Sequence, residues 1–139
     1  ACEENPELIV DYATLTGAAR VAGGTEIAAM FSNDAGLSST ISTASNKTDD
    51  PVWPLPLHDD YTYMLSSKVA DLVNSAASGF AGASTAALFL KHFVGDDIPW
   101  LHFDVMAFNN RARPGRPEGG EAMALRAVYE YLEQHYGNA

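Results

Sequence analysis

Residues 8–15 form the stretch that most constrains the fold of this chain. The stretch opens with the apolar run LIV and shows no alternation between apolar and polar side chains. An uninterrupted run of this kind is typical of a strand that is buried on both faces, as in a parallel sheet covered by helices. Thr16, Gly17 and Ala18 then have the pattern of a turn. The sequence therefore predicts an inner sheet strand that ends at a glycine turn.

Further along the chain, short strand patterns alternate with helix patterns. Asn33 and Asp34 offer a helix cap, and the prolines around Trp53 are expected to break regular structure. We expect strands at 26–32 and 100–105, helices at 35–48, 83–94 and 121–136, and a polar loop at 109–120. The last two helices are expected to bury one apolar face each, formed by Ala83, Ala86, Ala87, Leu90, Phe93 and Val94 and by Ala122, Leu125, Val128, Tyr129 and Leu132.

Strands that alternate with helices indicate an α/β fold, with a mainly parallel sheet flanked by helices in three layers. The 139 residues fit one domain or a large part of one, and 47% of them are hydrophobic, which is enough for a core. The first residues have neither an initiator Met nor the pattern of a signal peptide. We therefore expect a processed, truncated or excised chain.

Charge and cysteine content exclude some function classes. The net charge is −10, so the chain repels phosphate backbones and nucleic-acid binding is not expected. No apolar run approaches the roughly 20 residues that span a bilayer, so no membrane partner is expected. Cys2 is the only cysteine, which precludes an internal disulfide and favours a reducing compartment, here the cytoplasm. A secreted chain that needs no disulfide is the alternative.

Several polar or glycine-rich groups could carry chemistry. His102 and Asp104 share one face of a strand and could hold a metal, although a hydrogen-bonded polar pair at a strand edge is the favoured interpretation. The adjacent carboxylate pairs are favoured as turn or cap residues over general acids. The GFAG segment at 79–82 could bind an anion, with close helix packing favoured. The arginines of the 111–116 loop could clamp a carboxylate or phosphate, or lie in solvent or at a subunit contact.

The turn after residues 8–15 has two interpretations that sequence physics leaves even. A buried parallel strand delivers its carboxyl end to the ligand crevice of an α/β sheet, where glycine lets another molecule approach the main chain. The same pattern also suits an ordinary junction between a strand and a helix.

Residues 11–24, DYATLTGAARVAGG, resemble the ATLTGA segment of the leucyl aminopeptidase (cytosol aminopeptidase) family. Further segments are similar to family segments and stand in family order: AMFSND at 29–34, WPLPL at 53–57, ADLVN at 70–74, SGFAGASTAALFLKHF at 78–93 and WLHFDV at 100–105. The ordered set covers nearly the whole chain and is highly specific. The resemblance implies that residues 1–139 are the C-terminal segment of an aminopeptidase catalytic domain.

Membership of that family implies a metal-dependent aminopeptidase that removes N-terminal, leucine-like residues from peptides. It also implies two divalent metal ions, zinc or manganese, a possible bound bicarbonate, and assembly as a hexamer. The family's ligand signature, Asn-Thr-Asp-Ala-Glu-Gly-Arg-Leu, is absent from this chain and is expected upstream of it. We therefore expect no catalytic residue and no metal ligand here, no activity from residues 1–139 alone, and association with the upstream half of the same protein.

The resemblance assigns this chain a substrate-side role. Thr14, Leu15 and Gly17 match family positions whose backbone contacts the substrate and the bicarbonate beside the metals. Met106 matches a position that helps to form the pocket for the first side chain of the peptide. Many relatives have alanine there, in the sequence D-I-A-G, so the larger and softer methionine is expected to reshape this pocket.

Two other hypotheses stay open on the sequence. The chain could be a non-catalytic binding or assembly module that keeps only the aminopeptidase scaffold. It could also be an unrelated α/β hydrolase or transferase that uses His102 and Asp104.

Overall fold

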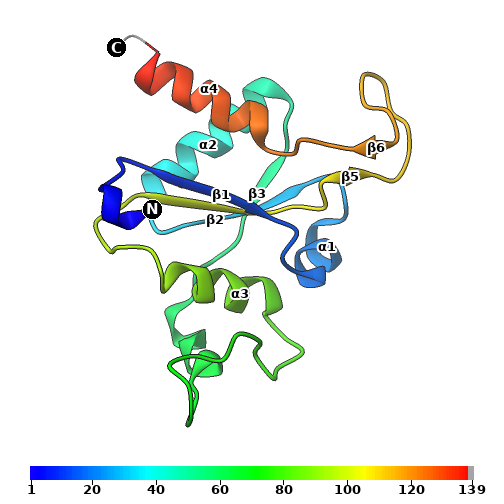
Figure 1. Cartoon of the computed structure of the whole chain (residues 1–139). Coiled ribbons are helices and arrows are strands. Elements are labelled where there is room, and N and C mark those ends of the chain that lie inside the picture. The colour runs from blue at the N-terminus through cyan, green and yellow to red at the C-terminus, as the bar shows by residue number, and fades with distance from the viewer. Residues whose placement is uncertain (138–139) are drawn as a thin grey trace.

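A computed structural model describes residues 1–137 and shows a four-stranded sheet between two layers of helices (Figure 1). The strands of this sheet are β1 (Ile9–Ala13), β2 (Ala28–Ser32), β3 (Val52–Pro54) and β4 (Trp100–Asp104). The helices are α1 (Gly17–Gly23), α2 (Ala35–Thr48), α3 (Gly82–Lys91) and α4 (Leu125–Tyr136), and 3-10 turns lie at Cys2–Glu4 and Asp59–Leu65. Helices α2 and α4 cover one face of the sheet, and α1 and α3 lie on the other. The expected three-layer α/β fold is confirmed.

The strands follow the order β1-β4-β2-β3. β1 runs parallel to β4, with Asp11 opposite His102, and β2 runs parallel to β3, whereas β2 and β4 are antiparallel. The sheet is therefore mainly parallel, as predicted. Within residues 1–137, however, β1 pairs only with β4 and is the outermost strand, so the prediction of an inner strand was wrong. A single partner strand leaves β1 half-buried, and Tyr12 is 44% exposed.

The strand that is buried on both faces is β4. Phe103 and Leu101 lie in the cluster between the sheet and the helices α2 and α4. Trp100 lies in the cluster on the opposite face, together with Phe31 and Ala87. Because successive side chains of a strand point to opposite faces, β4 contributes to both halves of the core.

Helix α2 begins and ends where the sequence predicts. The Asp34 side chain accepts a hydrogen bond from the Leu37 amide over 2.9 Å and so satisfies one of the unpaired N–H groups of the first turn. Asp49 ends the helix in the left-handed conformation, with φ 51°, and its amide donates to the Ser45 carbonyl. Leu37 and Ile41 are buried against the sheet.

The prolines around Trp53 do not exclude a strand. Val52–Pro54 forms β3 at the edge of the sheet, and the Leu55 amide donates to the Met30 carbonyl of β2 over 2.8 Å. The expected break in regular structure was wrong, because an edge strand makes ladder hydrogen bonds on one side only and therefore tolerates proline.

The two C-terminal helices bury only part of the faces that the apolar periodicity predicts. α4 begins at Leu125, later than expected, and buries Ala127 and Val128 against α2 and the sheet. Leu125 and Tyr129 were expected in the core but are 55% and 63% exposed. The small Ala127 lets the axis of α4 approach α2 closely, and this sets the rotation of the helix. In α3 the expected Ala83 and Ala87 are buried, whereas Phe93, expected on the same face, lies beyond the end of the helix at Lys91 and is 61% exposed.

The amino end of α4 is held by a carboxylate from outside the helix. Asp50, which is 1% exposed, accepts hydrogen bonds from the amides of Ala124 (3.0 Å), Arg126 (2.8 Å) and Ala127 (3.3 Å). Burial raises the pKa of Asp50 above its ordinary value, and the hydrogen bonds from Ala127 and Ala124 oppose that shift. Asp50 thus ties the end of α2 to the start of α4.

We expect Asp50→Asn to lower the free energy of unfolding by about 2 kcal/mol, because an amide nitrogen would face N–H donors that need an acceptor. Chemical denaturation of the purified protein measures the change. Asp49→Asn is the matched control, since Asp49 is exposed and asparagine tolerates its positive φ. Equal stability of the two variants would contradict the role of Asp50.

Tyr12 adds a pH-dependent contribution to stability. Burial, and secondly the charge of Asp50, raise the pKa of Tyr12 from 10.0 to about 12. The folded protein therefore holds this proton more tightly than the unfolded chain, so the contribution is complete below pH 10.0 and is lost as the pH rises to about 12. Ultraviolet titration should show a tyrosine that ionises near pH 12 and disappears in Tyr12→Phe. A titration curve that this substitution leaves unaltered above pH 10.0 would contradict the assignment.

Candidate functional site

The carboxyl ends of β1 and β4 lie side by side, because the two strands are parallel and in register. A hollow of about 480 Å³ opens there. It is lined by Thr14, Leu15, Thr16, Gly17, Arg20, Val105 and Met106. The hollow thus brings together all four residues that the resemblance assigns to substrate contact, from two segments that are far apart in the sequence.

Asp104 holds the loop that follows β1. One carboxylate oxygen accepts from the amides of Leu15 (3.0 Å) and Thr16 (3.2 Å), and the other accepts from the Thr16 hydroxyl (2.5 Å). The peptide bonds here are trans, so the carbonyls of Thr14 and Leu15 point away from Asp104. Within residues 1–137 these two carbonyls accept no hydrogen bond. The loop therefore has its N–H groups satisfied and its carbonyls free to accept from a ligand.

Thr16 also links this loop to α1. Its hydroxyl oxygen accepts a hydrogen bond from the Ala19 amide over 3.3 Å and caps the helix. α1 in turn packs closely on α3, because a β-carbon on Gly82 would lie only 3.1 Å from the β-carbon of Ala18. This contact supports the packing interpretation of segment 79–82.

His102 and Asp104 do not form a joint site. His102 is fully buried and stacks between the rings of Trp100 and Phe31. Its Nδ1 lies 2.6 Å from one Asp11 oxygen, and the other Asp11 oxygen accepts from the Trp100 indole over 2.7 Å. The favoured interpretation, a hydrogen-bonded polar pair at a strand edge, was wrong, because the two side chains bond to different partners and lie on the inner strand β4. A substrate cannot reach His102. The network joins β1 to β4 below the hollow.

Met106 and Arg20 are in contact at the hollow. Arg20 Nη1 lies 3.4 Å from Met106 Sδ. Arg20 Nη2 lies beside Gly17, because a β-carbon added to this glycine would be 3.4 Å from it. Ala107, the next residue, has a left-handed φ of 55° and turns the chain away from the hollow. Sequence analysis missed Arg20, although its spacing of three residues from Gly17 places both on one side of a helix.

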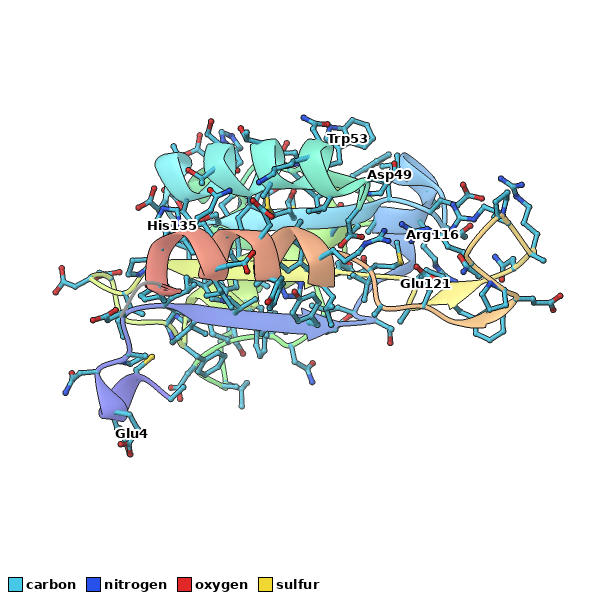
Figure 2. The ribbon with its side chains drawn as sticks, turned by 90° about the horizontal axis from the view of Figure 1, so that it is seen from above. Glu4, Asp49, Trp53, Arg116, Glu121 and His135 are labelled. Atoms are coloured by element: carbon cyan, nitrogen blue, oxygen red, sulfur yellow. The ribbon has the colours of Figure 1, made fainter. Side chains whose placement is uncertain are left out.

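A small hairpin of β5 (Phe108–Asn109) and β6 (Gly119–Gly120) follows the hollow, so the expected loop contains two short strands. Arg116 extends from this hairpin toward Glu121 and Asp49 (Figure 2). It forms an ion pair with Glu121 and donates to the Asp49 carbonyl over 2.8 Å. The hairpin is thereby attached to the end of α2.

The other two arginines of this loop bind a carboxylate of the chain itself. Arg111 Nη2 and Arg113 Nη1 lie 2.8 Å and 2.9 Å from the two oxygens of Glu26, which precedes β2. These guanidinium groups thus clamp a carboxylate, as one interpretation of the sequence suggested, but that carboxylate is internal. The loop is a structural tie between the hairpin and the sheet.

Metal ligands were also sought among the described residues. Within residues 1–137, no three His, Cys, Asp or Glu side chains lie close enough together to hold a metal ion. Over the same residues, none of the helices combines the length and the apolar character needed to cross a membrane.

Comparison with known proteins decides the family. A family model described as the cytosol aminopeptidase family, catalytic domain, matches residues 1–129. The chain belongs to the cytosol aminopeptidase family. The resemblance found in the sequence is thereby confirmed, and the hypothesis of an unrelated hydrolase or transferase is wrong.

Curated and solved members of the cytosol aminopeptidase family cover most of this chain. A probable cytosol aminopeptidase of Cenarchaeum symbiosum is 44% identical over 133 residues, which are 92% of this chain and 27% of that protein. The crystal structure of cytosol aminopeptidase from Coxiella burnetii is 58% identical, with a TM-score of 0.91, over 96% of this chain and 29% of that one. A bottromycin maturation enzyme in complex with manganese is 37% identical, with a TM-score of 0.85, over 92% of this chain and 29% of that one. The chain spans between a quarter and a third of the length of these relatives.

We expect Asp104→Asn to loosen the loop of this cytosol aminopeptidase segment, because an amide nitrogen cannot accept from the groups that Asp104 now binds. Hydrogen exchange at the amides of Leu15 and Thr16 should become at least about tenfold faster, equivalent to about 1.4 kcal/mol of local stability. Exchange mass spectrometry measures the rates. Asp97→Asn, at an exposed position, is the control, and unchanged rates in Asp104→Asn would sink the idea.

Proposed function

We propose that the protein containing this chain is a metal-dependent aminopeptidase that hydrolyses N-terminal, leucine-like residues from peptides. In this proposal the chain supplies the substrate-side scaffold, through Thr14, Leu15, Gly17 and Met106, and the catalytic groups come from elsewhere in the protein. Family membership supports the proposal. The observation that carries it is the single hollow that these four residues line, at the carboxyl ends of two parallel strands.

The loop after β1 has the properties of a peptide-binding edge. The free carbonyls of Thr14 and Leu15 would accept hydrogen bonds from N–H groups of the peptide, as an exposed strand does when another strand adds to it. Asp104 holds the loop in place before binding, so little backbone entropy is lost when the peptide docks. Gly17 has no side chain, which lets the substrate approach the main chain closely.

Two divalent metal ions, zinc or manganese, belong to the proposal for the whole protein, and bicarbonate rests on the resemblance alone. A related bottromycin maturation enzyme was solved in complex with manganese. The residues of this chain do not fit such ions: both Asp104 oxygens accept hydrogen bonds, and residues 1–137 contain no cluster of three ligands. We therefore assign the metal ligands, and the polarisation of the scissile carbonyl, to the upstream part of the protein.

The proposal extends to the surroundings of the chain. The outer edge of β1, unpaired within residues 1–137, offers backbone groups to the upstream half of the same protein. We further propose a hexameric assembly, a cytoplasmic location and peptides as substrates. The alternative of a non-catalytic binding or assembly module predicts that the complete protein hydrolyses no peptide.

Hydrolysis of leucyl peptides by the full-length protein tests the proposal. We expect turnover with manganese or zinc, loss of turnover on chelation, and recovery when the metal is returned. Residues 1–139 alone are expected to be inactive. The full-length protein could also be folded and metal-loaded and yet cleave none of a panel of peptides that differ in their N-terminal residue. That result would support the binding module instead.

Met106→Ala should change which first residue is preferred. Removal of the thioether side chain enlarges the hollow, so we expect kcat/KM for N-terminal phenylalanine, relative to leucine, to rise about tenfold. Met64→Ala is the matched control, since Met64 lies in the 3-10 turn and does not line the hollow. An unchanged ratio in Met106→Ala would remove Met106 from the first side-chain pocket.

A further inference from the structure

We propose that Arg20 lets this hollow accept, besides leucine-like first residues, a first residue that carries a carboxylate, so that N-terminal glutamate or aspartate is preferred over the neutral amide of the same shape. This inference rests on the proposed function and adds a substrate class to the same site. It comes from the contacts of Arg20, which neither the sequence pattern nor family membership brings out.

Arg20 differs from the other arginines in its partners. Each of the others donates to an oxygen atom of the chain: Arg111 and Arg113 to Glu26, Arg116 to Glu121, and Arg126 to the Asp49 carbonyl. Within residues 1–137, the only polar contact of the Arg20 side chain is with Met106 Sδ, at 3.4 Å. A thioether sulfur is a weak acceptor, so the guanidinium keeps nearly all of its donor capacity.

The free N–H donors of Arg20 lie at the hollow. Arg20 is one of the residues that line it, and its guanidinium lies beside Gly17. The same guanidinium touches Met106, which the proposed function places at the pocket for the first side chain. A group that binds Arg20 from within this hollow is therefore carried by the first residue of the peptide.

The chemistry of the hollow favours an anion there. All residues that line it, apart from Arg20, are uncharged. The carboxylate of Asp104 is buried and has both oxygens engaged by the loop, and it forms no ion pair with Arg20. A planar guanidinium with several free N–H groups matches a carboxylate through two parallel hydrogen bonds. A glutamine amide has one acceptor and no charge, so it gains less from the same contact.

The ratio of kcat/KM for Glu-Ala-Ala to that for Gln-Ala-Ala tests the inference in the full-length, metal-loaded protein. We expect a ratio of about ten, because a charge-assisted pair at a partly exposed site discriminates to about that extent. In Arg20→Met, which keeps an unbranched apolar stem and removes the charge, the ratio should fall to about one. Arg126→Met removes an equal charge from α4, away from the hollow, and should keep the ratio of the unmodified protein.

Charge reversal gives an independent readout. Arg20→Glu should favour Lys-Ala-Ala over Gln-Ala-Ala. In the unmodified protein, the preference for glutamate should shrink when the salt concentration is raised from about 0.02 M to about 0.5 M, because salt screens the charge pair. Thermal unfolding of each variant identifies any loss of folding. A ratio near one in the unmodified protein, or a ratio of ten that survives in Arg20→Met, would overturn the inference while leaving the proposed function intact.

Failure of the proposed function gives a different result. In that case no tripeptide is hydrolysed, and equilibrium binding of Glu-Ala-Ala and Gln-Ala-Ala to the full-length protein replaces the kinetic ratio. Binding of the glutamyl peptide should be about tenfold tighter, and Arg20→Met should abolish the difference. Equal affinities in the unmodified protein would overturn the role of Arg20.

Discussion

The rest of the site depends on the buried carboxylate of Asp104. A charge that is 3% exposed is costly unless donors surround it, and the loop after β1 supplies two amides and a hydroxyl. Those bonds turn the carbonyls of Thr14 and Leu15 away from Asp104, and they hold Thr16 where it begins α1. α1 then carries Arg20 to the hollow. One interaction between neighbouring parallel strands thus arranges the acceptors, the helix and the cation of the site.

The same principle, a polar group satisfied by a distant segment, recurs across this acidic chain. Asp50 receives three amides at the start of α4, and Glu26 receives Arg111 and Arg113 from the hairpin. With a net charge of −10, the chain uses most of its arginines for such ties. Arg20 stands apart because its guanidinium meets a sulfur atom, and this difference identifies a cation that can serve a ligand.

Several elements follow from local sequence, and others do not. α2 was predicted with its bounds because Asp34 caps it and the cap is a contact between neighbours in the chain. Helix α1 was not predicted, because the glycine suggested a turn at residues 16–18, whereas Gly17 and Ala18 lie in the first turn of α1. The burial of β1 was not predicted correctly either, because an apolar run does not tell which strands lie on either side. In α4 the burial of Val128 was predicted, but the exposure of Leu125 and Tyr129 was not, because the rotation of a helix is set by the surface it packs against.

By itself, the sequence determined the alternation of strands and helices, the bounds of α2 and, through its ordered motifs, the family. It also singled out Thr14, Leu15, Gly17 and Met106, which share one hollow. Only the tertiary structure decided that Asp104 binds the loop, that His102 is buried, and that Arg20 lines the site. The reason is physical: local patterns specify backbone conformation, whereas the partner of a buried polar group depends on which distant strands pair and in which register.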